Sequence, residues 1–264
     1  MGVSESWDRR IARAGQLATA DEAVRPLLTF YGRLLTLQRN LSEFLRNRQG
    51  WTPSGSLDRD RTVLRAGVPA LLEAIAQDSP QPLAVEAGQL LQGPEAAIDD
   101  LLVACWLVPS DRQFFAKAVL QPYARWLADV GIPPIDRALA RSDNRCPFCG
   151  GMPQLSILQS SGGSLDGGGR ALLCATCLTV WPFRRVLCVH CGEEDERKLG
   201  YFHSTAYEQL RIDACDSCRH YLKTVDLTRL GIAVPIVDEV AGASLDVWAR
   251  GQGYEKVELN LVGL

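Results

Sequence analysis

Hydrophobic residues recur at helical spacing through the first half of the chain. Between Asp21 and Leu45 they stand three or four positions apart, which predicts one long amphipathic helix. Four further segments show a similar pattern, each bounded by proline, glycine or a capping aspartate or serine. These predicted helices cover 64–76, 82–91, 94–108 and 111–129. The first half is therefore expected to be all-α.

The pattern changes after Asn144, where short apolar runs typical of β-strands replace the helical spacing. A glycine- and serine-rich stretch over 160–169 predicts a flexible loop between two of these strands. The tail from Pro235 to Leu264 predicts a strand followed by a helix around 244–251. The predicted strands before the tail are 155–158, 170–173, 199–203 and 210–213.

Composition excludes several classes of protein. The chain has 264 residues, a net charge of −3 and 47% hydrophobic residues, values typical of a globular protein rather than a disordered one. Its longest apolar run, Leu101–Val108, is far shorter than the roughly 20 residues of a membrane span. The N-terminus has no apolar core like that of a signal peptide. We expect a cytoplasmic protein with no membrane insertion.

Eight of the nine cysteines stand in four C-x-x-C pairs. The gaps between successive pairs are 24, 10 and 23 residues, which makes an internal repeat of about 42 residues. Cys105 stands apart in an apolar helix, so a buried structural thiol is expected there. The paired cysteines are Cys146 and Cys149, Cys174 and Cys177, Cys188 and Cys191, and Cys215 and Cys218.

This spacing is typical of metal ligands. Two intervening residues let both thiolates face one ion, and two such pairs held by a β-hairpin give a tetrahedral site with four sulfur ligands. The repeat favours one site from the first two pairs and another from the last two, with a cross-braced pairing as the alternative. Thiolates suit zinc and iron alike. Four protein ligands leave no open position, so the sites are expected to be structural or, with iron, to carry single electrons.

No arrangement of catalytic residues stands out, so the chain is not expected to be an enzyme. His190 lies within the third pair and His220 lies two residues after the fourth, so either could replace a cysteine ligand. Because eight thiolates are present, we expect both imidazoles to lie at the surface or around a site instead.

These patterns predict an α+β protein with four units. They are a helical domain over 1–140, a first small β metal module over 141–183, a second over 184–223, and a short αβ tail over 224–264.

Several linked motifs resemble the formate dehydrogenase accessory protein family, often called FdhE. The first module opens with Cys146-Pro-Phe-Cys149-Gly150. Trp181, Arg184 and Arg185 stand between the second and third pairs. The stretches Cys215–Lys223 and Val237–Tyr254 also resemble the family. The resemblance covers most of the chain, and 146–223 is its most specific part.

The resemblance implies a cytoplasmic maturation factor that binds the catalytic subunit of a molybdenum- or tungsten-containing respiratory formate dehydrogenase before that subunit is exported. It also implies two tandem rubredoxin-like modules, associated with iron, in which all eight paired cysteines are ligands. Trp181, Arg184 and Arg185 are then candidates for binding the client subunit, with a packed linker between the modules as the alternative. A homodimer is left open.

Two other functions compete with this one. A zinc-ribbon protein that binds nucleic acid would need a basic face, yet residues 141–223 carry ten Lys and Arg against nine Asp and Glu, a net charge of 10 − 9 = +1. A rubredoxin-like electron carrier would need iron and a reversible redox change.

Overall fold

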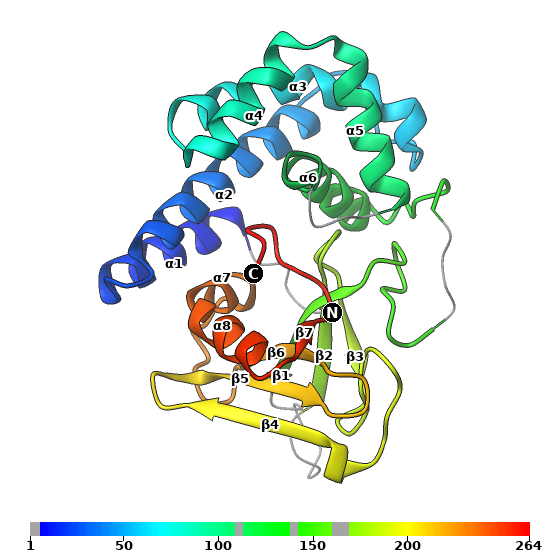
Figure 1. Cartoon of the computed structure of the whole chain (residues 1–264). Coiled ribbons are helices and arrows are strands. Elements are labelled where there is room, and N and C mark those ends of the chain that lie inside the picture. Colours follow the sequence, from blue (N-terminus) through cyan, green and yellow to red (C-terminus); the bar gives the residue numbers. More distant parts are fainter. Residues whose placement is uncertain (1–5, 109–112, 138–141, 160–168) are drawn as a thin grey trace.

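The computed structural model describes residues 6–108, 113–137, 142–159 and 169–264, and it joins a helical layer to a single β-sheet (Figure 1). The predicted α+β class is confirmed. Every helix predicted before residue 130 is present, and an additional one precedes them. These helices are α1 (Trp7–Ala20), α2 (Arg25–Arg46), α3 (Leu57–Gln77), α4 (Gln81–Gln92), α5 (Glu95–Leu107) and α6 (Phe114–Val130).

The additional helix, α1, has a polar buried face. It begins at the cap residue Ser6, and the inner face buries Arg10 and Arg13 together with alanines. Arg13 donates two hydrogen bonds, of 2.9 and 2.6 Å, to the carboxylate of Asp238 far along the chain. Sequence periodicity missed this helix because arginines occupy positions where an apolar residue would mark the buried face.

The sheet has the strand order β3-β2-β1-β6-β5-β4, with β7 paired to β6. All four strands predicted before the tail are present, and β3 and β6 are additional. The predicted loop over 160–169 lies, except for Gly169, outside the described residues. The strands are β1 (Pro153–Gln159), β2 (Gly169–Cys174), β3 (Val180–Phe183), β4 (Leu199–Ser204), β5 (Tyr207–Cys215), β6 (His220–Asp226) and β7 (Glu255–Lys256).

The sheet order reproduces the sequence repeat. Strands β1, β2 and β3 of the first repeat correspond to β4, β5 and β6 of the second, and each set forms an antiparallel meander. The two sets meet where β1 pairs in parallel with β6. At this seam the hydroxyl groups of Ser156 and Thr224 are hydrogen-bonded and buried. The two repeats therefore share one continuous sheet.

The tail differs from its prediction. Pro235 begins a helix, α7 (Pro235–Ala241), where a strand was expected, and α8 (Ala243–Gly251) follows at the predicted place. The one strand of the tail, β7, comes after α8. Proline at the first position of a helix loses no hydrogen bond, and a short apolar run such as Ile236–Ala241 fits a buried helix as well as a strand. Here the tertiary packing decides in favour of the helix.

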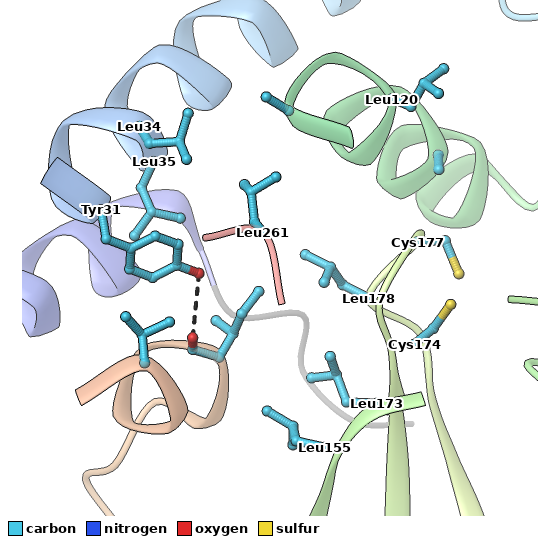
Figure 2. Packing of buried hydrophobic residues seen from close by; sticks show 14 of the residues in the cluster. Tyr31, Leu34, Leu35, Leu120, Leu155, Leu173, Cys174, Cys177, Leu178 and Leu261 are labelled. Atoms are coloured by element: carbon cyan, nitrogen blue, oxygen red, sulfur yellow. Dashed lines mark hydrogen bonds between the residues drawn. The ribbon is translucent and has the colours of Figure 1, made fainter. Parts of the chain in front are cut away.

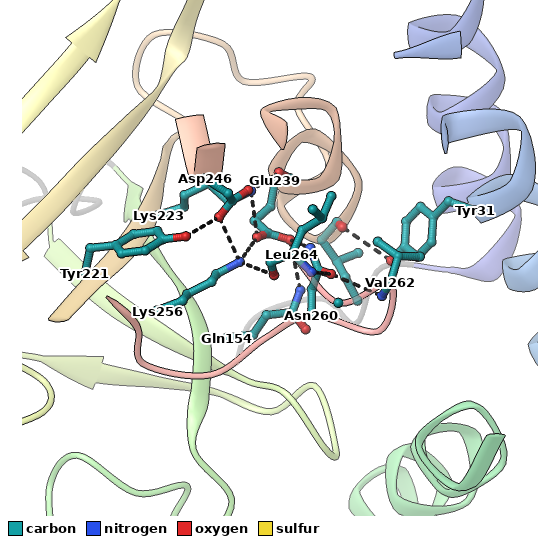
Figure 3. Close-up of polar contacts among 12 residues, drawn as sticks. Tyr31, Gln154, Tyr221, Lys223, Glu239, Asp246, Lys256, Asn260, Val262 and Leu264 are labelled. Atoms are coloured by element: carbon teal, nitrogen blue, oxygen red, sulfur yellow. Dashed lines mark hydrogen bonds and ion pairs between the residues drawn. The ribbon is translucent and has the colours of Figure 1, made fainter. Parts of the chain in front are cut away.

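A buried cluster of charges ties the tail to the sheet (Figure 3). Lys223 of β6 and Lys256 of β7 form ion pairs with Glu239 of α7 and Asp246 of α8, and all four side chains are inaccessible to solvent. Burial alone would raise the pKa of Glu239, but the two ammonium groups outweigh it and hold that pKa at about 2. Opposite charges thus balance inside the protein, as burial requires.

The helices and the sheet share one hydrophobic core. Figure 2 shows Tyr31 and Leu35 of α2 across from Leu155 and Leu173 of the first repeat, with the tail residue Leu261 between them. The hydroxyl of Tyr31 donates a hydrogen bond of 3.3 Å to the carbonyl of Ile236 in α7. The helical part is therefore packed on the first repeat and on α7. Among the residues described, no helix combines the length and the apolar character needed to cross a bilayer.

Candidate metal centres

The first two cysteine pairs converge beneath α6. The sulfur atoms of Cys146 and Cys177 are 3.5 Å apart, as are those of Cys149 and Cys174. All four sulfurs lie within 4.8 Å of one another, and all four residues are buried. One pair precedes β1 and the other joins β2 to β3, so the antiparallel pairing of β1 with β2 brings them together.

The last two pairs converge in the same way in the second repeat. The sulfur atoms of Cys188 and Cys218 are 3.7 Å apart, and those of Cys191 and Cys215 are 3.8 Å apart. Cys191 is exposed and Cys218 is partly exposed, whereas Cys188 and Cys215 are buried. The structure thus brings the pairs together sequentially, as the repeat favours, and not in the cross-braced arrangement.

The sulfur positions fit a tetrahedral ion. Four sulfurs at about 2.3 Å from a central zinc lie about 3.8 Å apart, close to the 3.5 to 3.8 Å separations observed. A disulfide would need an S–S distance of about 2.05 Å, and all eight cysteines are free. Both clusters could therefore hold a metal ion.

Electrostatics points to the same chemistry. Hydrogen bonds from neighbouring groups lower the pKa of Cys146, Cys149 and Cys191. Burial raises the pKa of the Cys174 and Cys177 thiols in the first cluster, and of the Cys188 and Cys218 thiols in the second. Without a cation, such thiols hold their protons, because neighbouring thiolates would repel one another in a buried site. A divalent or trivalent cation reverses this balance, since it stabilises all four thiolates together.

The same backbone turn follows every cysteine pair. The residue after the second cysteine has a positive φ at each of the four turns: 71° at Gly150, 57° at Leu178, 77° at Gly192 and 59° at Arg219. In three of these turns its amide donates to the carbonyl of the first cysteine, over 2.8 to 3.1 Å. Leu178 and Arg219 are the two non-glycine residues with positive φ in the described part of the chain. This conformation is unfavourable for a residue with a side chain, so its repetition shows that the turn is required.

The first cluster is enclosed by its neighbours. Gln121 of α6 donates a 2.9 Å hydrogen bond to the carbonyl of Ala175, between the two cysteines of the second pair. The amide of Thr176 donates to the sulfur of Cys174 over 3.3 Å. A Cβ on Gly151 would lie 2.9 Å from the Thr176 hydroxyl and 3.0 Å from the Cys174 sulfur, so only glycine fits without a shift. The first cluster is thus held by the helical part of the protein.

The second cluster has two imidazoles beside it instead. The rings of His190 and His220 stack with centroids 3.6 Å apart and planes 7° from parallel. Ligand atoms of both lie within 4.8 Å of the Cys218 sulfur. The Nδ1 atom of His220 lies 2.8 Å from the Cys218 carbonyl oxygen. The sequence predicted that these histidines lie at the surface or around a site, and it did not predict that they stack on each other.

The three candidate client-binding residues have different environments. Trp181 is buried, and its indole N–H donates a 2.9 Å hydrogen bond to the carbonyl of Asp143, so its side chain packs inside the first repeat. Arg184 is exposed and forms a 2.7 Å ion pair with Glu194. Arg185 is exposed as well. The side chains of the two arginines can therefore contact a partner directly, and that of Trp181 cannot.

Cys105 lies buried in α5, far along the chain from the paired cysteines, as predicted for a structural thiol.

Comparison with known proteins supports the motif-level resemblance. Residues 186–262 match the family model "FdhE, C-terminal domain". The chain is 37% identical to an FdhE homologue of Aquifex aeolicus, over 57% of this chain and 52% of that protein. It is 28% identical to an FdhE homologue of Pseudomonas putida, over 97% of this chain and 86% of that protein. Another homologue, from Shewanella oneidensis, is matched over 58% of its length, so the matches span little more than half of some relatives.

The fold agrees with that of a solved structure. The crystal structure of the FdhE protein from Pseudomonas aeruginosa superposes with a TM-score of 0.71, at 24% identity, over 97% of this chain and 96% of that one. By sequence and by fold the chain is FdhE-like, as its motifs predicted.

Proposed function

We propose that this FdhE-like chain is a non-catalytic accessory protein, acting in the cytoplasm, that binds the catalytic subunit of a formate dehydrogenase and is needed for that subunit to become active. Similarity to FdhE homologues indicates the accessory protein family. The observation that carries the proposal is the presence of two four-cysteine clusters with tetrahedral sulfur spacing, in a chain whose sequence and fold are FdhE-like.

In this proposal the eight paired cysteines are the ligands of two metal ions, with iron favoured by the resemblance and zinc as the alternative. The metal modules extend over 141–183 and 184–223, between the helical domain and the tail. An ion with four protein sulfurs would hold the turns together and, if it is iron, would exchange an electron. A site closed in this way does not activate water, which agrees with an accessory role.

The client would contact the exposed side of the metal modules. Arg184 and Arg185 lie on the segment between the modules, and both side chains are accessible. Trp181 contributes indirectly, because its packing fixes the start of that segment. Whether two copies of the chain associate is a separate question, answered by sedimentation of the metal-loaded protein.

A deletion strain tests the function directly. We expect loss of formate oxidation while the catalytic polypeptide is still made, and we expect the affinity-tagged chain to co-purify with the immature subunit. Normal formate dehydrogenase activity in the deletion strain would contradict the proposal.

Metal analysis of protein purified without oxygen separates the remaining alternatives. Two ions per chain support the ligand assignment, and a zinc-only, colourless protein would exclude an electron carrier. Salt-dependent binding to DNA or RNA would favour the nucleic-acid alternative.

A further inference from the structure

A cleft of about 470 Å³ lies on the face of the sheet opposite α8, and the metal sites do not account for it. Tyr201 of β4 lines it, while the next residue, Phe202, points to the other face and packs on Trp248 of α8. Its floor includes Arg211 and Asp213 of β5, and Arg170 of β2 reaches it from the first repeat. The volume is that of sites that bind small molecules or a few residues of a peptide.

Arg170 is a buried cation that the protein satisfies only in part. Its side chain is 5% exposed, its Nη2 lies 3.3 Å from the Asp213 carboxylate, and its Nη1 donates to carbonyls of the segment 184–187. Its Nε–H has no hydrogen-bond partner among the residues described. Burial lowers the pKa of Arg170, as expected for a cation removed from water. A buried N–H of this kind is normally paired.

The carboxylate of Asp213 is shared among several donors. Arg211 donates to it through Nε over 2.7 Å, and the hydroxyl of Thr224 donates over 2.7 Å. With Arg170, two guanidinium groups thus face one carboxylate. Apart from the cysteines, the charged side chains of the cleft are Arg170, Arg185 and Arg211 against Glu196 and Asp213, so they carry one uncompensated positive charge. The thiolates of Cys188 and Cys215 add negative charge at the metal site, so this positive charge is local to the guanidinium groups. This charge favours an anionic group in the cleft.

The cleft opens at an unpaired strand edge. Strand β4 pairs with β5 alone among the described residues, so it is the outermost strand on its side of the sheet. Figure 1 shows β4 along the outside of the molecule, on the side away from helices α1 to α6. Tyr201, at 65% exposure, stands between this edge and the cleft. An extended peptide added to such an edge gains backbone hydrogen bonds and directs every second side chain to the same face.

We propose that the cleft binds an extended acidic segment of the client protein, which pairs with the edge of β4 and places a carboxylate group against Arg170 and Arg211. The identity of the client rests on the proposed function, whereas the chemistry of the segment rests on the cleft. The sulfur ligands Cys188 and Cys215 also border the cleft, so a client bound there would lie against the second metal site.

Peptide binding to the metal-loaded chain tests this inference. The probe is a fluorescein-labelled peptide of about eight residues that alternates glutamate with valine, and its matched control carries glutamine in place of glutamate. Fluorescence anisotropy should show binding of the acidic peptide that is at least about tenfold tighter than binding of the control and that weakens with salt. Equal binding of both peptides would overturn the proposal. It would also be overturned if acetate displaced the labelled peptide as effectively as the unlabelled peptide does, because that result indicates a site for small anions.

Variants locate the binding. Arg211→Met and Arg170→Met should each weaken binding of the acidic peptide about tenfold or more. Arg197→Met is the matched control, since this exposed arginine of the same repeat pairs with Asp195 outside the cleft, and it should leave binding unchanged. Circular dichroism and metal content establish that each variant is folded. A folded Arg211→Met protein that binds the acidic peptide as the wild type does would contradict the proposal.

The same variants separate this inference from the function it rests on. If the wild type co-purifies with the client subunit and a folded Arg211→Met protein does so equally well, the cleft proposal fails and the accessory function stands. If the wild type does not bind the subunit at all, the accessory function fails, and the peptide measurement still decides the chemistry of the cleft.

Discussion

The two cysteine clusters share one sequence pattern and one backbone turn, yet their environments differ. All four cysteines of the first cluster are buried beneath α6, which supplies a hydrogen bond to the turn between Cys174 and Cys177. In the second cluster Cys191 is exposed, and the neighbours are two stacked histidines and an open cleft. A ligand motif therefore determines which sulfurs can come together, whereas the packing around it decides whether the cluster is enclosed or accessible.

Replacing equivalent ligands in the two clusters is the strongest test of this difference. Cys149→Ser should lower the free energy of unfolding by about 3 kcal/mol or more, because a fully buried site cannot replace the lost ligand by water. Cys191→Ser should lower it by about 1 kcal/mol or less, because water can reach the vacant position. Urea unfolding and the metal content of each variant measure the effect. Equal losses for the two variants would remove the distinction between the sites.

Two glycines test how tightly each cluster is packed. Gly151→Ala should lower the free energy of unfolding by about 2 kcal/mol, because the new methyl group would clash with the Thr176 hydroxyl and the Cys174 sulfur. At Gly192, beside the second cluster, no atom lies within 4 Å of the methyl group that Gly192→Ala would add. This substitution should therefore lower the free energy of unfolding by only about 1 kcal/mol, the strain of the positive φ. Thermal unfolding of both variants gives the comparison. A larger loss for Gly192→Ala would contradict it.

The contact between α6 and the first cluster can be removed separately. Gln121→Leu leaves the carbonyl of Ala175 without its donor, and it also removes the acceptor of a hydrogen bond from Gln38. We expect a loss of about 1.5 kcal/mol in the free energy of unfolding. His190→Ala, at the exposed side of the second cluster, is the matched control and should change it by about 0.5 kcal/mol or less. Similar losses would show that α6 does not distinguish the sites.

The rate of metal release should differ between the clusters. A chelator should remove the ion of the second cluster at least about tenfold faster, a difference of about 1.4 kcal/mol in the barrier, because the first cluster opens only when the packing under α6 opens. Release followed by the absorbance of the chelator complex should therefore show two phases. The fast phase should be absent in Cys191→Ser if that variant has lost the second ion. A single phase with an amplitude of two ions would argue against the difference.

Much of the fold could be predicted from local pattern. The helices between residues 21 and 130 follow from apolar spacing, and the strands flanking the cysteine pairs follow from short apolar runs. The pattern missed α1, which buries arginines, and β6, in which Lys223 is inaccessible to solvent. These two omissions have one cause: a charged residue is assigned to the surface until its partner is known, and the partners Asp238 and Asp246 lie elsewhere in the chain. The pattern also missed β3, which is only four residues long.

The cysteine clusters, like the fold, could be predicted only in part from the sequence. The spacing of two residues within each pair acts over a single turn, so the sequence established that the two sulfurs of each pair can share an ion. The internal repeat favoured the sequential arrangement of the pairs and left the cross-braced one open. Only the tertiary structure decided that the two repeats share one sheet, that α6 covers the first cluster and that the second remains open beside a cleft. The reason is physical. Ligand spacing is a property of adjacent residues, whereas burial depends on which distant surfaces the chain packs together.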